Sequence, residues 1–376
     1  MKKIYFVNIF LFISFLAISF FAASCKKNPV TPVTVNKDTT TVATPATVGL
    51  YELDSSIYKI TEIAVSKIGT SNVDYGEIFD TGSGGMVIDA DSLLPAAMIG
   101  ANGFIFSGDS TVVNGITIYN QTSVIEYGAD SATTDKVYGN LAYAQVTIGD
   151  QPTGGFIIKR LPFFLYYKAV DGSGNKYAPH EFDTFGVSDE YDAVFGNGVS
   201  ISSPFSYYNP GTGLTKGFKM AALGTSYFSS QFGYSPSVIT LGLTASDLSS
   251  SSGFTFNTLY FYSGAGYPPF IPATVTYNNK SFSTKVLFDT GTEPYSYLED
   301  PTYNGKPAQL ATNSGVSIVT PTGFSYSYTT TATENLTNIE NPNSTGGSTC
   351  IISLEYFINN EFLLDFTDHK LGLKVN

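Results

Sequence analysis

The sequence predicts an all-β fold made of two lobes. Composition supports β structure, because the 376 residues include 26 Tyr and 29 Phe, only 13% are charged, and no long stretch carries apolar residues at helical spacing. The length suffices for two lobes of ordinary domain size, each with its own hydrophobic core. A short motif is also duplicated: an apolar residue, Phe, Asp, Thr, Gly and a hydroxyl residue follow one another at 78–83 and again at 287–292. We expect one copy in each lobe.

The N-terminus has the pattern of a secretory signal over residues 1–24. Two lysines precede an apolar run at 4–21, and small residues stand directly before Cys25. These small residues resemble a bacterial lipobox, which implies that Cys25 becomes the lipid-modified N-terminus after cleavage. An uncleaved membrane anchor is the alternative, because about 18 apolar residues approach the length of a spanning helix. Either interpretation predicts an exported, extracytoplasmic globule attached to a membrane of the bacterial cell envelope.

A tether is predicted at residues 25–50, where Thr, Val, Pro and Lys predominate without a core-forming pattern. The polar residues 249–253 then separate two β-rich regions, each of which contains one Asp-Thr-Gly triplet. We therefore expect the first lobe at residues 51–248 and the second lobe at residues 249–376.

Short strands are predicted wherever apolar and polar residues alternate between turn signals. The alternating segments are residues 57–63, 116–119, 124–127, 144–148, 273–277, 281–284, 361–366 and 371–375. Asn278 and Asn279 are expected to form the hairpin turn between two of these strands. Two short helices are expected near residues 225–231 and 354–360.

Charge and residue usage argue against several classes of function. A net charge of −12 with a pI near 4.5 disfavours nucleic acid as a partner. The two histidines, His180 and His369, are expected in solvated loops, and Cys350 is expected to be buried and unpaired. This scarcity disfavours Ser-His-Asp catalysis, Cys-His catalysis and a zinc site. The Gly-rich stretch 82–85 lacks the Lys of a phosphate-binding loop. We expect no metal and no cofactor, which leaves carboxylates as the reactive groups.

The two motif copies place Asp80 and Asp289 at matching positions after apolar runs. Burying a single charged carboxylate costs free energy, so two matching copies suggest two carboxylates that meet. Such a pair shares a proton and can activate a water molecule. One Asp-Thr-Gly arises by chance in about one chain in ten, whereas two copies with the same flanking residues are far rarer. We therefore interpret the two aspartates as a catalytic pair.

Further segments follow the two motifs in an order typical of one family. Residues 123–128 and 138–149 resemble a flap hairpin and the strand after it, and residues 191–196 resemble a hydrophobic-hydrophobic-Gly segment that crosses beneath the first catalytic loop. Residues 237–242 resemble the strand that closes the first lobe, and the closing segment of the chain is matched at residues 351–353, 362–365 and 370–373. Together these segments make residues 51–376 similar to a pepsin-family aspartic endopeptidase.

The resemblance implies a bilobal, pepsin-like acid protease fold, with two β-barrel-like lobes and the active-site cleft between them. It implies that Asp80 and Asp289 are catalytic, and that Tyr127 with Gly128 forms the flap over the substrate. The residues to which it gives a supporting role around the aspartates are Thr81, Gly82, Ser83, Thr290, Gly291 and Thr292. We expect a monomer that binds an extended polypeptide substrate.

Three positions depart from the family pattern. Val87 stands where the family has the tryptophan that partners the flap tyrosine, and the chain contains no Trp. Ser353 replaces the expected Gly of the second lobe, and Glu293 adds a carboxylate beyond the second motif, either in a subsite or on the solvated surface. Two alternatives stay open: a catalytically inactive pepsin-like protein that binds peptides or glycans or acts as an inhibitor, and a β-rich adhesin or glycan-binding lipoprotein.

Overall fold

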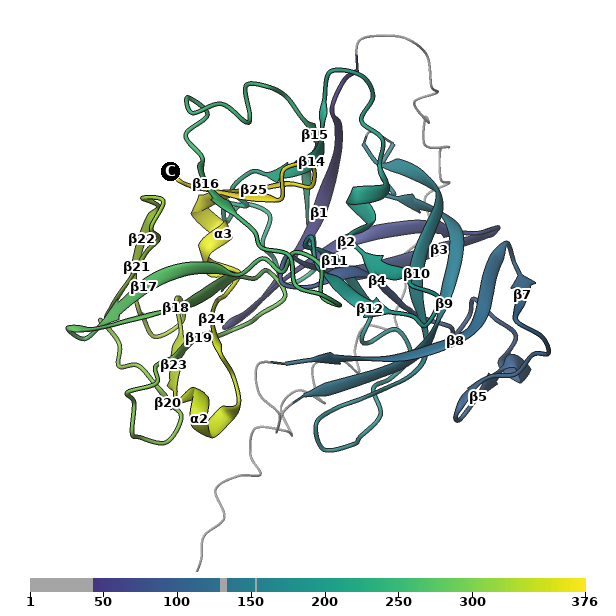
Figure 1. Ribbon diagram of the computed structural model, residues 1–376, viewed down its shortest axis with the longest axis horizontal. Helices are drawn as coiled ribbons and strands as arrows, with labels where there is room; N and C mark the ends of the chain where they lie inside the picture. The colour runs from purple at the N-terminus through teal and green to yellow at the C-terminus, as the bar shows by residue number, and fades with distance from the viewer. Residues whose placement is uncertain (1–42, 129–133, 153) are drawn as a thin grey trace, which may run out of the picture.

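The computed structural model describes residues 43–128, 134–152 and 154–376. The predicted signal segment, the predicted lipidation site Cys25 and most of the predicted tether lie outside these residues. Within the described part of the chain, no helix is both long and apolar enough to cross a bilayer. Nearly all regular elements are strands, as predicted, and they form two main sheets (Figure 1).

The larger sheet is made of most of the strands of the first lobe and of three strands from the C-terminal part of the chain. Its strands, in spatial order, are β16 (Thr255–Thr258), β26 (Lys370–Val375), β25 (Asn360–Asp365), β14 (Thr215–Met220), β15 (Gly233–Leu243), β1 (Ala46–Ser55), β2 (Tyr58–Ile68), β3 (Ser71–Asp80), β11 (Thr184–Val187), β4 (Gly84–Asp89), β10 (Phe156–Val170), β9 (Asp135–Ile148), β8 (Ile116–Tyr127) and β7 (Ser110–Val113). Because β25 pairs with β14, the sheet extends across the predicted lobe boundary. Residues 46–50 belong to β1 and pair with β15, so the fold starts before the predicted end of the tether.

The second sheet forms most of the C-terminal lobe, on the left of Figure 1. Its strands, in spatial order, are β20 (Ala308–Gln309), β23 (Thr337–Glu340), β19 (Ser296–Glu299), β24 (Thr349–Ile352), β18 (Lys280–Phe288), β17 (Ile271–Tyr277), β21 (Gly315–Val319) and β22 (Ser325–Thr329). The remaining elements are the pairs β5 (Ile99–Gly100) with β6 (Gly103–Phe104) and β12 (Tyr191–Val194) with β13 (Ser200–Ser202), the 3₁₀ turns η2 (Ala96–Met98) and η3 (Pro204–Tyr207), and the helices α2 (Pro342–Thr345) and α3 (Glu355–Asn359).

Local predictions from the sequence had mixed outcomes. The hairpin turn is confirmed, because Asn278 and Asn279 both have positive φ and connect β17 to β18. The helix near residues 354–360 is confirmed as the short α3. The prediction of a helix near residues 225–231 is wrong. The backbone of this segment bonds to β1 instead of forming helical hydrogen bonds, because the Asp54 N–H donates to the Ser229 carbonyl at 2.9 Å.

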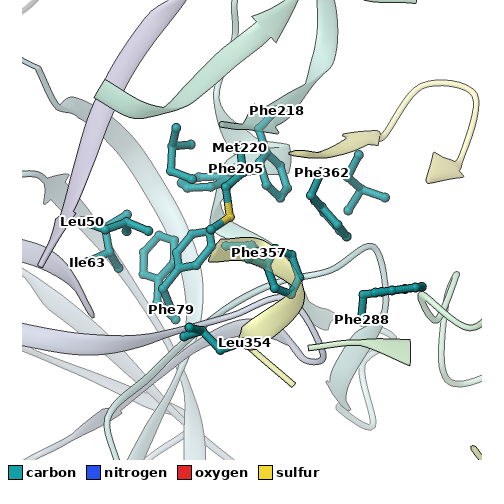
Figure 2. Close-up of a cluster of buried hydrophobic side chains, with 14 of the residues drawn as sticks. Leu50, Ile63, Phe79, Phe205, Phe218, Met220, Phe288, Leu354, Phe357 and Phe362 are labelled. Atoms are coloured by element: carbon teal, nitrogen blue, oxygen red, sulfur yellow. The ribbon is translucent and has the colours of Figure 1, made fainter. Parts of the chain in front are cut away.

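A row of aromatic rings runs through the core between the two Asp-Thr-Gly motifs, and Figure 2 labels all of its members except Tyr356. Neighbouring ring centroids in the row are between 4.5 and 6.2 Å apart, and the rings follow in the order Phe79, Phe205, Phe218, Phe362, Phe357, Tyr356 and Phe288. All seven side chains are buried. Because Phe79 and Phe288 directly precede the two aspartates, this packing helps to fix one motif relative to the other.

Candidate active site

Each Asp-Thr-Gly motif lies at the C-terminal end of a strand that pairs in parallel with a second strand. In the first lobe β3 ends at Asp80 and pairs with β11, which brings Phe79 opposite Phe185. In the second lobe β18 pairs with β24, which brings Phe288 opposite Ile352. The two halves of the chain therefore build the same local frame around their motifs.

The strand beneath the first motif is β11, and not residues 191–196 as the sequence predicted. Gly186 of β11 pairs with Asp80. A Cβ atom on Gly186 would lie 2.7 Å from atoms of Ser83, so this position requires glycine. Residues 191–194 instead form β12, which pairs with β13. Both segments combine apolar residues with a following Gly, so their sequences do not show which one lies under the motif.

Ser353 occupies the corresponding place in the second lobe, one residue after β24. Its side chain is fully buried, and its N–H donates to Ser296 Oγ at 3.0 Å. The Asp289 N–H donates to the carbonyl of Ile352 at 2.8 Å. The second lobe thus accommodates a hydroxymethyl group where the first lobe requires Gly.

The threonines of the two motifs hold the loops together. The Thr81 N–H donates to Thr290 Oγ1, the Thr290 N–H donates to Thr81 Oγ1, and both distances are 3.0 Å. The Thr81 hydroxyl also donates to the Phe288 carbonyl at 2.9 Å, and the Thr290 hydroxyl donates to the Phe79 carbonyl at 2.6 Å. Both side chains are buried, so these four bonds lie away from solvent.

The carboxyl groups of Asp80 and Asp289 meet where the two loops face each other. A Cβ atom on Gly82 would lie 2.6 Å from the Asp289 carboxyl carbon, and one on Gly291 would lie 2.8 Å from the Asp80 carboxyl carbon. Each carboxyl therefore lies directly against the glycine of the opposite loop. Both aspartates retain 8% exposure, so they are enclosed without being sealed from solvent.

Each aspartate accepts matching hydrogen bonds from its own loop. Asp80 Oδ1 accepts the N–H groups of Gly82 and Ser83, and its Oδ2 accepts the Ser83 hydroxyl. Asp289 Oδ1 accepts the N–H of Gly291, and its Oδ2 accepts the Thr292 hydroxyl. All six predicted supporting residues therefore lie at the pair. The glycines, Ser83 and Thr292 bond to the two carboxyl groups, and Thr81 and Thr290 bond the two loops to each other.

Solved structures are similar to this chain over most of its length, although no protein-family model and no curated protein matches the sequence. An aspartic proteinase from Irpex lacteus superposes with a TM-score of 0.55 at 16% identity, over 89% of this chain and 98% of that one. Basic 7S globulin from soybean superposes with a TM-score of 0.55 at 11% identity, over 89% of this chain and 96% of that one. The fold is that of the pepsin-like aspartic proteinases. Because one neighbour is named a proteinase and the other a globulin, the pepsin-like fold alone leaves activity open.

The charge state of the pair follows from its surroundings in this pepsin-like fold. Burial raises the pKa of Asp289 well above its ordinary value, and the negative charge of Asp80 and a hydrogen bond with Asp80 raise it further. The hydrogen bonds from Thr292 and Gly291 act in the opposite direction. Asp289 therefore keeps its proton to higher pH than an aspartate in water does.

The predicted flap tyrosine, Tyr127, contacts a carboxylate that had no predicted role. Tyr127 ends β8, and its hydroxyl donates to Asp192 Oδ2 at 2.7 Å. Gly128 follows with a φ of 133°. Asp192 Oδ1 accepts the N–H of Gly84 at 2.9 Å. Asp192 had no predicted role because residues 191–196 were assigned to the strand beneath the first motif, and this strand is β11.

Two acidic side chains of the segment after β11 lie close to the pair. Burial raises the pKa of Glu190 well above its ordinary value, and the charges of Asp192, Asp80 and Asp289 raise it further. Burial also raises the pKa of Asp192 to about 7, against hydrogen bonds that lower it. These two carboxyl groups beside the pair therefore keep their protons to higher pH than carboxyl groups in water do.

Glu293 belongs to a group of charged side chains beside the second motif. Burial raises the pKa of Glu293 to about 8, the charge of Glu355 raises it further, and the charge of Lys59 lowers it. Lys59 and Glu355 form an ion pair of 2.6 Å. The solvated-surface interpretation of Glu293 is therefore wrong, because the side chain is half-buried beside Lys59 and Glu355.

Both histidines lie in turns with partly exposed rings, as predicted, and each ring also contacts a carboxylate. His180 Nδ1 lies 2.8 Å from Asp183 Oδ2, and its ring lies on Tyr75 with centroids 4.3 Å apart. His369 Nδ1 lies 2.5 Å from Asp189 Oδ2 in the turn between β25 and β26.

Cys350 is buried and free, as predicted. Among the described residues, no group of three His, Cys, Asp or Glu side chains is arranged to hold a metal ion.

Proposed function

We propose that this protein is an aspartic endopeptidase that hydrolyses polypeptides with Asp80 and Asp289. The observation that carries the proposal is the contact of each carboxyl group with the glycine of the opposite loop. This contact places two acids, one from each half of the chain, on either side of one position. Two carboxyl groups joined by a hydrogen bond do not both ionise readily, so they share a proton.

The chemistry needs one protonated and one ionised carboxyl group. Asp80, which accepts three hydrogen bonds from its own loop, takes a proton from a water molecule held between the pair. Asp289 donates its proton to the carbonyl oxygen of the scissile peptide. Attack of the water oxygen on the carbonyl carbon then gives a neutral tetrahedral diol, without a covalent intermediate. Asp80 then gives the proton that it took from the water to the amide nitrogen, and the C–N bond breaks. One diol hydroxyl returns its proton to Asp289, and an amine and a carboxylic acid are released.

The proposed substrate is an extended polypeptide segment in the cleft between the lobes. The hairpin of β8 and β9 supplies the flap. This role is supported by Asp192, which accepts the hydroxyl of Tyr127 and the N–H of Gly84, four residues after Asp80. An extended segment offers backbone groups to such a hairpin, while its side chains enter the walls of the cleft.

Attachment to a bacterial membrane is part of the proposal. It is supported by the apolar run before Cys25 and by the small residues at the expected cleavage point. The unsubstituted protein should be labelled by radioactive palmitate and should start at Cys25, and Cys25→Ala should lose the label. An unlabelled chain that keeps residues 1–24 in the unsubstituted protein would instead favour the uncleaved anchor.

The assay that tests the proposed reaction uses a soluble form that starts after Cys25. Denatured protein is supplied as substrate from acidic to neutral pH, with and without pepstatin. The proposal expects internal cleavage that is favoured by acid and blocked by the inhibitor. Peptide binding without consumption would instead indicate the inactive pepsin-like binding protein.

A further inference from the structure

The Asp192 carboxyl group connects the flap to the strand that follows the first catalytic loop. Its Oδ2 accepts the hydroxyl of Tyr127 at 2.7 Å, and its Oδ1 accepts the N–H of Gly84 at 2.9 Å. Tyr127 is the last residue of β8, and Gly84 is the first residue of β4, four residues after Asp80. One side chain therefore bridges the flap and the catalytic strand, with both of its oxygen atoms in use.

The position of Val87 explains why such a bridge is needed. Val87 is fully buried among apolar residues that include Leu141 and Phe164, and the Tyr127 ring packs against the same group. Valine has no polar atom, so it cannot bind the tyrosine hydroxyl. A half-buried phenol without a hydrogen-bond partner loses free energy, which would favour release of the flap.

The Tyr127 side chain is fixed from two directions. Its ring lies 5.2 Å from the ring of Phe182, centroid to centroid, and its hydroxyl reaches Asp192. Phe182 sets the ring in place by packing, whereas Asp192 fixes the hydroxyl through a directional bond. Of these two contacts, only the bond to Asp192 also reaches the strand after Asp80.

We propose that Asp192 is a positioning residue that holds the flap over the catalytic pair by bridging Tyr127 and Gly84. The inference rests on the proposed function, because a flap position affects turnover only if a peptide beneath it is hydrolysed. The charged groups that face Asp192 are Glu190 and Asp80, both acidic. The bridge therefore depends on neutral donors, the phenol and the backbone N–H, and not on an ion pair.

The first experiment detects the bridge without using activity. Because the chain contains no Trp, Tyr127→Trp gives the full chain, purified in detergent, a single indole on the flap. The indole N–H is a donor and can bond to Asp192. We expect the steady-state anisotropy of its emission to fall when Asp192→Ala is added, and to fall less when Asp192→Asn is added, because Asn keeps an acceptor oxygen.

Glu126→Ala serves as the matched control for this measurement. Glu126 is the neighbouring carboxylate on the flap, and its bond to Lys136 is exposed to solvent. The anisotropy should stay unchanged with Glu126→Ala. Equal anisotropy with and without Asp192→Ala, or an equal fall with Glu126→Ala, would overturn the inference.

The second experiment is a double-mutant cycle on peptide hydrolysis by the full chain with its native tyrosine. We expect Asp192→Ala and Tyr127→Phe each to lower kcat/KM by about tenfold, and the double variant to lose no more than either single variant. The loss should include kcat, and Asp192→Asn should restore part of it. Additive losses would show that Asp192 acts apart from the flap and would overturn the inference. A chain that shows the anisotropy pattern but no hydrolysis keeps the bridge and rejects the proposed function.

Discussion

Thr81 and Thr290 exchange hydrogen bonds across the boundary between the lobes, and each hydroxyl accepts the other's backbone N–H at 3.0 Å. Each hydroxyl also donates to a carbonyl of the opposite strand. These two threonines therefore make four hydrogen bonds, and both side chains are buried. This exchange keeps the two aspartates facing each other, because each threonine directly follows its aspartate in the chain.

Replacing Thr81 by valine should reduce both stability and activity. Thr81→Val keeps the shape of the side chain but leaves the Thr290 N–H and the Phe288 carbonyl without partners in a buried place. The expected cost is about 2–5 kcal/mol in the free energy of unfolding, measured by urea denaturation. Thr81→Ser keeps the hydroxyl and is the control, with an expected cost of about 1 kcal/mol. Equal stability of the Val and Ser variants would contradict this role.

The two candidate glycines beneath the first motif should respond differently to substitution. Gly186→Ala places a Cβ atom 2.7 Å from Ser83, so we expect loss of hydrolysis and a lowered melting temperature. Gly196→Ala is the matched control, because no atom lies within 4 Å of its Cβ position. Calorimetry and the peptide assay on both variants decide between the two segments. If Gly186→Ala is tolerated and Gly196→Ala loses activity, residues 191–196 would be the strand beneath the first motif, as the sequence predicted.

Stability should decrease as pH rises because of buried glutamates. Burial raises the pKa of Glu52 from 4.5 to about 7, and its side chain is fully buried. Below about pH 4.5 the group is protonated in both the folded and the unfolded state, so its contribution to stability is complete. Between pH 4.5 and 7 the unfolded state ionises first, and stability falls until the folded pKa is passed.

The variant Glu52→Gln isolates this contribution. Its melting temperature should fall less than that of the unsubstituted protein between pH 4.5 and pH 8, because Gln does not ionise. The exposed Glu126→Gln is the control and should follow the unsubstituted protein. Parallel melting curves for Glu52→Gln and the unsubstituted protein across this range would refute the assignment.

The alkaline limit of hydrolysis should move when the Thr292 hydroxyl is removed. This hydroxyl donates to Asp289 and lowers its pKa, so Thr292→Val should raise the pKa of Asp289. Asp289 then keeps its proton to higher pH, and the alkaline limb of the profile of kcat/KM against pH should shift upward. The exposed Thr274→Val is the control and should leave the profile unchanged. A downward shift with Thr292→Val would contradict the role of Asp289 as the proton donor.

The sequence was sufficient to predict that Asp80 and Asp289 lie together because each belongs to a short local motif that occurs twice. It was not sufficient to place Gly186, because residues 184–186 and 194–196 have the same local pattern and only strand pairing separates them. Asp192 was missed because its partner Tyr127 is 65 residues away, and no local pattern marks such a contact. The incorrect helix at residues 225–231 has a similar origin, since its backbone bonds to β1.

The most direct test of the account is hydrolysis by the single variants Asp80→Asn and Asp289→Asn. Each keeps the size of the side chain and removes one of the two carboxyl groups, so each should lower kcat on a denatured protein substrate by at least about a thousandfold while the fold is retained. Loss of hydrolysis in both variants, with melting temperatures near that of the unsubstituted protein, is the predicted result. Hydrolysis that continues unchanged in either variant would contradict a mechanism in which the two aspartates act on one water molecule.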